Sequence, residues 1–259
     1  MEPSYESRIQ KLRQLLSSHR RILVLGGAGL STESGLLDFR SDKARAHCHS
    51  TYGHPVEVLL SRGFFESEPE TFYACFRELL CKEAKPNRGH LALAKLEEQG
   101  RLLSILTQNV DGLHQKAGSR RVLELHGNVR EGLCLSCGRP ILKAWPGDGV
   151  PRCPDCGGLC RPDMVLYDEA LNEYVLRAAR ARMFSADLLL IVGTSLSVFP
   201  AGDLPQYYTG RELVIINRTP TPLDNSFAPL SGSQYMTALS CRRMMVAGTS
   251  ALISALTVL

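Results

Sequence analysis

Four aliphatic runs, each ending in a small polar turn, constrain the fold of this chain most strongly. They are residues 21–25, 102–106, 186–192 and 213–216, and helical patterns separate them. Short buried strands that alternate with helices are typical of an α/β fold, in which helices cover a parallel sheet. Such sheets bind their ligands just past the carboxyl ends of the strands. The sequence therefore predicts one crevice at which the polar turns converge.

The first of these turns is rich in glycine. Residues 26–29 read Gly-Gly-Ala-Gly, and residues 31–34 (Ser-Thr-Glu-Ser) are suited to start a helix. A strand, a glycine turn and a helix can bind a pyrophosphate through backbone N–H groups, although a tight turn without a ligand is the simpler alternative. Dehydrogenases also carry an acidic residue about 20 positions past the glycines. Residues 46–50 contain none, so a hydride-transfer domain is disfavoured.

The second turn carries the most polar chemistry. Residues 107–114 read Thr-Gln-Asn-Val-Asp-Gly-Leu-His, and residues 123–128 read Leu-Glu-Leu-His-Gly-Asn. Amides, a carboxylate and a histidine near one strand end exceed what a core segment carries. Residues 193–197 form a further glycine-and-hydroxyl turn, and Asn217 ends the last run. Their convergence supports a nucleotide site better than any single turn does.

Two CxxC pairs, separated by fifteen residues, predict a metal site. Their members are Cys134, Cys137, Cys153 and Cys156. Four thiolates at this spacing can surround zinc tetrahedrally, and they leave no open position for a reacting water. We therefore expect a closed structural zinc site. The five other cysteines, Cys160 among them, follow no pattern and are predicted to be small buried residues.

Composition narrows the class of protein further. The 259 residues are 44% hydrophobic, carry a net charge of +4 without a long basic run, and include nine cysteines. These features predict a cytoplasmic protein that makes no direct contact with nucleic acid. Residues 1–20 read as an amphipathic helix and not as a signal peptide. The uncharged residues 244–259 fall short of the about 20 that a membrane span needs, so a buried helix is expected there.

Several motifs follow one another in a fixed order from about residue 8 to residue 224. They are residues 27–31 with 34–35, Asp38-Phe39-Arg40, residues 107–111 with Leu113-His114, His126-Gly127, the four cysteines, residues 193–196 and Asn217. This set resembles the sirtuins, a family of NAD-dependent protein deacylases, and it is most similar to bacterial members.

The resemblance implies an α/β fold with a Rossmann-like NAD domain and a smaller inserted zinc-binding and helical domain. The NAD domain would comprise residues 1–42, 101–128 and 160–259, the helical insert residues 43–100, and the zinc-binding insert residues 129–159. An acyl-lysine peptide would lie between the two domains as an added strand, paired with Val165 and the residues after it. The protein is expected to act as a monomer.

By position, the resemblance also assigns residues to the NAD site. The pyrophosphate side would be formed by Gly27, Ala28, Gly29 and Thr32, and the mobile cofactor loop would contain Phe39 and Arg40. The residues at the nicotinamide and its ribose would be Gln108, Asn109, Val110 and Asp111. The adenosine side would be formed by Gly193, Thr194, Ser195 and Asn217.

In this interpretation Asp111 accepts an N–H of the nicotinamide carboxamide, and Asn109 and His126 are catalytic. His126, which also contacts the cofactor, is the general base on a ribose hydroxyl, a task suited to a group that titrates near neutrality. The acyl group passes from lysine to ADP-ribose and nicotinamide is released, so NAD is consumed as a co-substrate. The plainer alternatives are a solvated turn for His126 and a helix N-terminal carboxylate for Asp111. His90 is expected to pack or to cap a helix.

Three places depart from the family pattern. Leu37 replaces a proline before Asp38-Phe39-Arg40, which frees the backbone of the cofactor loop. Asp168 replaces a glycine beside the peptide groove, and Asn172 replaces a proline. Beyond residue 224 the pattern disappears. These departures keep two alternatives open: a protein mono-ADP-ribosyltransferase that uses the same NAD site, and a catalytically weak NAD-binding regulator.

Overall fold

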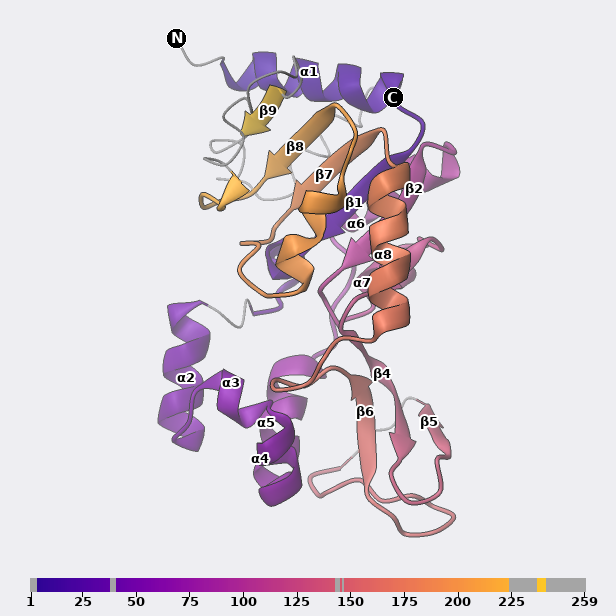
Figure 1. The fold of residues 1–259 in the computed structure, drawn as a ribbon. Helices are drawn as coiled ribbons and strands as arrows, with labels where there is room; N and C mark the ends of the chain where they lie inside the picture. The colour runs from indigo at the N-terminus through magenta and orange to yellow at the C-terminus, as the bar shows by residue number, and fades with distance from the viewer. Residues whose placement is uncertain (1–3, 38–40, 143–144, 146, 224–236, 241–259) are drawn as a thin grey trace.

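A parallel sheet of six strands forms the larger part of the molecule (Figure 1). The structure is a computed structural model that describes residues 4–37, 41–142, 145, 147–223 and 237–240. The strands follow the order β3-β2-β1-β7-β8-β9, and all neighbours are parallel. Their bounds are β1 Ile22–Gly26, β2 Leu102–Thr107, β3 Val122–Glu124, β7 Leu188–Val192, β8 Glu212–Ile216 and β9 Thr237–Ser240. The four aliphatic runs of the sequence are thus β1, β2, β7 and β8.

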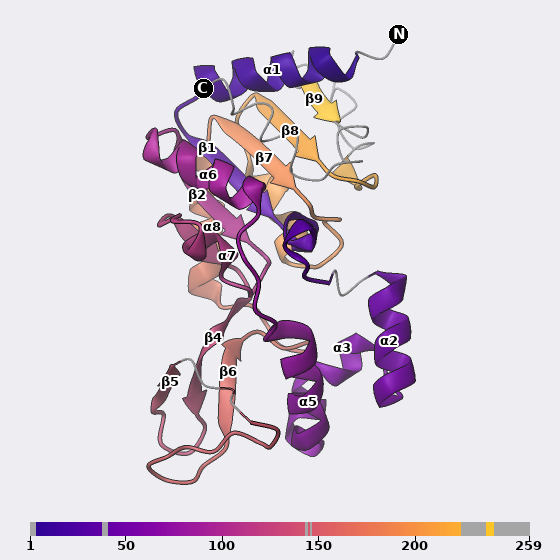
Figure 2. The same cartoon turned by 180° about the vertical axis from the view of Figure 1, so that it is seen from behind.

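Helices cover both faces of this sheet, which is why its central strands are apolar on both sides. Ile22 and Val24 of β1 face a core shared with α1 (Tyr5–Ser18) and α6 (Arg88–Glu98). Leu23 and Leu25 face the opposite core, which α8 (Glu173–Ser185) closes. Helix α8 lies in front of the sheet in Figure 1, and α6 lies in front of it in Figure 2.

A smaller module extends from the carboxyl ends of the central strands (Figures 1 and 2). It contains an antiparallel sheet in the order β5-β4-β6 and a group of helices. The strands are β4 Gly127–Cys134, β5 Pro140–Leu142 and β6 Cys160–Met164. The helices are α2 Asp42–Tyr52, α3 Val56–Leu59, α4 Arg62–Ser67 and α5 Pro69–Leu80.

Aromatic residues of α5 join the helices to the small sheet. Phe72, Tyr73 and Phe76 are fully buried, and the indole of Trp145 stacks on Tyr73 with ring centroids 5.9 Å apart. The Tyr73 hydroxyl donates to the carbonyl of Cys160 in β6, and the Trp145 N–H donates to the carbonyl of Val129 in β4 at 2.6 Å. Helices and sheet therefore share one core.

The α/β fold and its parallel sheet, predicted from the sequence, are confirmed. The expected N-terminal amphipathic helix is α1, which buries Ile9, Leu12, Leu15 and Leu16. Helix α6 belongs to the segment assigned to the helical insert, yet it packs on the parallel sheet. The domain boundaries themselves stay a prediction. Within the described ranges no helix is long and apolar enough to cross a membrane, and the run 244–259 lies outside those ranges.

Candidate functional site

The glycine turn after β1 packs directly against the turn after β7. The backbone N–H of Gly29 donates to the carbonyl of Gly193 at 2.8 Å. A Cβ on Gly27 would lie 2.7 Å from Cβ of Thr194, and one on Gly29 would lie 2.9 Å from Cα of Gly193. Both glycines therefore allow two loops to meet. Ala28 lies between them in η1 (Ala28–Leu30) and is half-buried, whereas Thr32, which begins η2 (Thr32–Ser34), is exposed.

The residues after β2 form a connected polar network. The Asn109 amide donates to the carbonyl of Gly27 at 3.1 Å and to the hydroxyl of Ser31 at 2.9 Å. The Ser31 hydroxyl in turn donates to Oδ2 of Asp111 at 2.6 Å. Asn109 and Asp111 are thus held by one hydroxyl that comes from the glycine turn. The sequence placed Ser31 at a helix start and in the family motif but did not predict this contact, because a pairing across 80 positions leaves no local pattern.

Asp111 also contacts the start of the short helix α7 (Leu113–Lys116), whose N-cap is Gly112. Its Oδ1 accepts the backbone N–H of Leu113 at 2.9 Å. The helix-terminal role that the sequence left open for this carboxylate is therefore present in the structure, next to its bond with Ser31. Both bonds fix the orientation of the carboxylate, which is half-buried at the carboxyl end of β2. Val110, which precedes it, is buried, and its carbonyl accepts the N–H of Val129 in β4 at 3.1 Å.

Gln108 connects two of the polar turns to His126. Its side-chain amide donates to the Thr194 hydroxyl at 2.9 Å. Its backbone carbonyl lies 2.9 Å from Nδ1 of His126. A carbonyl can only accept, so the neutral imidazole carries its hydrogen on Nδ1 and keeps its lone pair on Nε2. This is the tautomer that a general base acting through Nε2 requires.

The backbone around His126 joins the strand ends to the small module. The His126 carbonyl accepts the N–H of Val165 at 2.9 Å, directly after β6. Gly127 adopts φ 70°, and a Cβ there would lie 2.2 Å from the carbonyl oxygen of Asp163. Only glycine tolerates both conditions. The His-Gly pair of the sequence is therefore the point at which the chain passes from one sheet into the other.

The remaining predicted NAD-site residues lie at the ends of β7 and β8. The hydroxyls of Ser195 and Ser197 are 2.7 Å apart, and the Asn217 amide donates to the carbonyl of Thr219 at 3.0 Å. Leu196 follows Ser195 with φ 57°, a left-handed conformation that is rare for a branched side chain. Such backbone strain is concentrated at functional sites. Phe39 and Arg40 lie outside the described residues.

Two histidines are buried behind Asp111. His90 and His114 are 0% and 1% exposed, and their ring centroids are 4.8 Å apart. Nδ1 of His90 accepts the N–H of Asn87 at 3.3 Å in the capping box of α6, which confirms that His90 packs and caps a helix. Burial, and then His90, lower the pKa of His114 to about 3. Burial also lowers the pKa of His90, against the attraction of Asp111.

The four cysteines of the two CxxC pairs meet at the tip of the small sheet. Their sulfur atoms all lie within 4.8 Å of one another. Sγ of Cys134 is 3.5 Å from Sγ of Cys156, and Sγ of Cys137 is 3.7 Å from Sγ of Cys153. Tetrahedral zinc with bonds of about 2.3 Å separates its sulfur ligands by about 3.8 Å, whereas a disulfide needs about 2 Å.

The donor set therefore fits zinc. A metal requires these thiols as thiolates, and their spacing can place all four sulfur atoms around one ion. Cys160 is buried beside this site, as expected, and so are Cys48 and Cys75 elsewhere in the small module. Cys81 is only partly buried.

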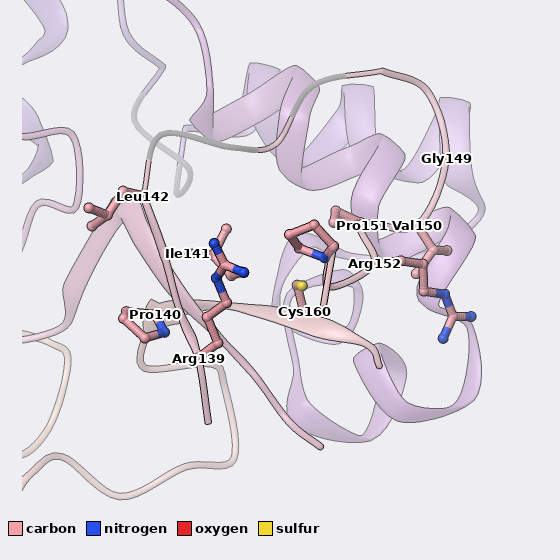
Figure 3. A pocket seen from close by; sticks show the side chains of 10 residues that line it. Arg139, Pro140, Ile141, Leu142, Gly149, Val150, Pro151, Arg152 and Cys160 are labelled. Carbon is pink, nitrogen blue, oxygen red and sulfur yellow. The ribbon is translucent and has the colours of Figure 1, made fainter. Parts of the chain in front are cut away.

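Two cavities lie at the small module. One of about 720 Å³ is bordered by β4, by β6 and by the segment that leads into α8, and Val165 lines it. The other, of about 460 Å³, lies between β5 and the loop before Cys160 (Figure 3). Arg139 and Arg152 line this second cavity, and Arg139 forms an ion pair with Asp155.

Fold and site together define an α/β protein with a four-cysteine site that fits zinc and with polar turns at the carboxyl ends of its parallel strands, and known proteins share this combination. The Sir2 family model matches residues 27–200. An NAD-dependent protein deacetylase of Clostridium perfringens is 44% identical over 227 residues, which cover 85% of this chain and 92% of that protein. An NAD-dependent protein deacetylase of Clostridium acetobutylicum is 41% identical over 224 residues, which cover 84% of this chain and 91% of that protein.

Solved structures agree with this match. A Sir2 protein with a p53 peptide and NAD⁺ is 40% identical, with a TM-score of 0.72 over 83% of this chain and 89% of that one. Another Sir2 enzyme superposes with a TM-score of 0.80 at 31% identity over 97% of both chains. The chain belongs to the Sir2 family, as the resemblance to sirtuins predicted.

Proposed function

We propose that this protein is an NAD-dependent protein-lysine deacylase, which transfers the acyl group from lysine to ADP-ribose and releases nicotinamide. The network from Ser31 through Asn109 and Asp111, together with the oriented imidazole of His126, supports the proposal most directly. The family membership and the names of the relatives agree with it. NAD, when bound, supplies the ADP-ribose that accepts the acyl group.

The residues have distinct tasks in this proposal. Asp111, fixed by Ser31 and by the N–H of Leu113, accepts an N–H of the nicotinamide carboxamide and orients it. Asn109, whose amide is held by Gly27 and Ser31, positions the adjacent ribose. His126 takes a proton from a ribose hydroxyl at Nε2, because Nδ1 donates to the carbonyl of Gln108.

The other predicted contacts of NAD complete this site. Residues Gly27, Ala28, Gly29 and Thr32 take the pyrophosphate side, and Gly193, Thr194, Ser195 and Asn217 the adenosine side. Hydrogen bonds between these turns, such as Gln108 to Thr194, support a single binding site. Four thiolates hold zinc in the small module, where it supplies no reacting water and acts through the position of β4 and β6.

The substrate in this proposal is an acyl-lysine in a protein or peptide. We further propose a cytoplasmic monomer.

Mass spectrometry of the products formed from NAD and an acetyl-lysine peptide tests the function. We expect free lysine peptide, nicotinamide and acetyl-ADP-ribose from the wild type, and a fall of at least a hundredfold in rate for His126→Ala, since general bases contribute about 10²–10⁴-fold. His19→Ala, which changes a histidine at the end of α1, is the control and should keep the wild-type rate.

The products also separate the alternatives. ADP-ribose attached to protein, with the acetyl group still on lysine, would identify a mono-ADP-ribosyltransferase. Equal and negligible turnover by the wild type and His126→Ala, with NAD bound by both, would identify a regulator that binds the nucleotide without consuming it.

A further inference from the structure

We propose that the cavity beside Val165 selects acyl-lysine peptides that carry a lysine or arginine next to the acyl-lysine, and that Asp168 is the main selecting residue, assisted by Asp163. The proposal rests on the proposed function and deepens it, because it names the class of peptide that the enzyme prefers. It concerns only the charge of the sequence around the acyl-lysine, and not the acyl chain.

The cavity is placed to hold the part of a peptide that flanks the reacting lysine. Its volume is about 720 Å³, and Val165, which lines it, is hydrogen-bonded to the backbone of His126. β4 and β6 contribute Gly127, Asn128 and Asp163 among others, and the segment before α8 contributes Asp168 and Asn172. Any chain that enters beside Val165 therefore passes these side chains.

The charges that line the cavity do not cancel. Arg161 forms a double hydrogen bond with Glu169, at 2.7 and 2.5 Å. Of the other charged lining residues, Arg62 is paired with Glu66 and Glu124 with Arg130, each at 2.8 Å. Asp163 and Asp168 remain, both exposed and both without an ion pair among the residues that the structure describes. Two unpaired carboxylates give the cavity a negative charge.

The backbone at Asp168 indicates that this side chain is not incidental. Asp168 adopts φ 70°, and Leu196 is the other non-glycine residue with positive φ in the described ranges. A left-handed aspartate costs about 1 kcal/mol, which a glycine would avoid. The turn is held in place by Glu169, which accepts from Arg161 and from the N–H of Leu166 at 2.9 Å.

Backbone donors of the segment beside the cavity are free to bind a peptide. Over the described residues, the N–H groups of Asp168, Ala170 and Leu171 have no hydrogen-bond partner, although this segment borders the cavity. Free donors beside the cavity are available to the backbone of a bound peptide. Backbone pairing fixes the register of such a peptide, so a basic side chain beside the acyl-lysine is brought to the two carboxylates.

A peptide panel with NAD tests this inference. One acetyl-lysine peptide is prepared with arginine, alanine or glutamate at each position flanking the acetyl-lysine, and kcat/KM is measured for the wild type and for Asp168→Asn, Asp168→Gly and Asp163→Asn. We expect the wild type to prefer arginine over alanine by about two- to fivefold, the range of an exposed ion pair, and to disfavour glutamate. The preference should shrink at high salt.

The variants have distinct expected results. Asp168→Asn keeps the shape and Asp168→Gly relieves the backbone strain, so both should fold, and in both the ratio of kcat/KM for the arginine peptide to that for the alanine peptide should fall towards one. Glu98→Gln, an exposed acid of α6 outside the cavity, is the control and should keep the preference.

Two failures remain distinguishable. Equal turnover of the arginine, alanine and glutamate peptides by the wild type, or an undiminished preference in Asp168→Gly, would overturn this inference and leave the deacylase proposal intact. Turnover of no peptide at all would overturn the deacylase proposal itself.

Discussion

At the scale of single residues, the site depends on side chains that are oriented by a hydrogen bond to another part of the protein. The imidazole of His126 has a defined tautomer because Nδ1 faces the carbonyl of Gln108. Asp111 and Asn109 have defined orientations because both contact Ser31. None of these contacts is between sequence neighbours, so the precision of the site is a property of how β1, β2 and β3 lie side by side.

Ser31 is the residue at which this dependence can be tested. Ser31→Ala removes one hydrogen bond to a carboxylate and one to an amide, contributions of about 1.5–3 and 0.5–1.5 kcal/mol. We expect kcat/KM for NAD to fall by about tenfold to a hundredfold, and the free energy of unfolding to fall by about 2–4 kcal/mol, because Ser31 is buried and both hydrogen bonds are lost.

Steady-state kinetics with acetyl-lysine peptide in excess measure this effect. Ser17→Ala, whose hydroxyl donates to the carbonyl of Gln14 on the exposed side of α1, is the matched control. Wild-type kinetics for Ser31→Ala would mean that Asn109 and Asp111 hold their positions without the shared hydroxyl.

At the scale of elements, α6 is joined to the glycine turn through its N-cap. Oδ1 of Asn87 accepts the N–H groups of Gly89 at 2.9 Å and of His90 at 3.3 Å. Its amide donates to the carbonyl of Leu30 at 2.7 Å. One side chain therefore satisfies the start of the helix and holds the loop that follows β1.

Two substitutions at Asn87 separate these tasks. Asn87→Ala removes the cap and the bond to Leu30, and we expect it to lower the free energy of unfolding by about 2–3 kcal/mol. Asn87→Asp keeps the oxygen that accepts the helix N–H groups, but its carboxylate cannot donate to the Leu30 carbonyl. We therefore expect its free energy of unfolding to fall by about half as much as that of Asn87→Ala. Urea unfolding measures both, and an Asn87→Asp variant as stable as the wild type would show that the bond to Leu30 contributes nothing.

At the scale of the whole molecule, much of the plan was readable from the sequence. The strands β1, β2, β7 and β8 were predicted because continuous apolar runs are what a sheet covered on both faces requires. The four cysteines were found because zinc knuckles have a fixed spacing. Strand β4 was missed, since Gly127 and Gly132 interrupt the alternation that marks a strand, and residues 160–164, which the sequence assigned to the NAD domain, form β6 of the small sheet.

Contacts between distant segments could not be predicted from the sequence. The sequence assigned Gly27 and Gly29 to the approach of a pyrophosphate, whereas their missing Cβ atoms also admit the turn at Gly193. Tyr73 and Trp145 lie 72 positions apart, and each also bonds to a strand of the small sheet. Such pairings arise only when segments that are distant in the sequence pack together, so no local pattern records them.

The buried pair His90 and His114 makes the stability of the whole fold depend on pH. In the unfolded chain a histidine protonates near pH 6.5, whereas burial lowers the pKa of His114 to about 3 in the folded state. Between these values the unfolded state binds more protons, so stability is complete above about pH 6.5 and is lost as the pH falls. His114 alone accounts for about 1.4 kcal/mol per pH unit, or about 2 kcal/mol at pH 5.

Substitution of His114 by a side chain that does not titrate should remove this dependence. The free energy of unfolding is measured at pH 7 and at pH 5 for the wild type and for His114→Gln. We expect the decrease between the two pH values to be about 2 kcal/mol smaller in the variant than in the wild type. His114→Leu is a second variant, for the case that the amide does not fit the buried site. His49→Gln, an exposed histidine of α2, is the control. Protonation of the zinc thiolates also destabilises the fold in acid, but it affects the wild type and the variants equally. Parallel pH profiles for the wild type and both His114 variants would therefore show that the imidazole is not held neutral behind Asp111.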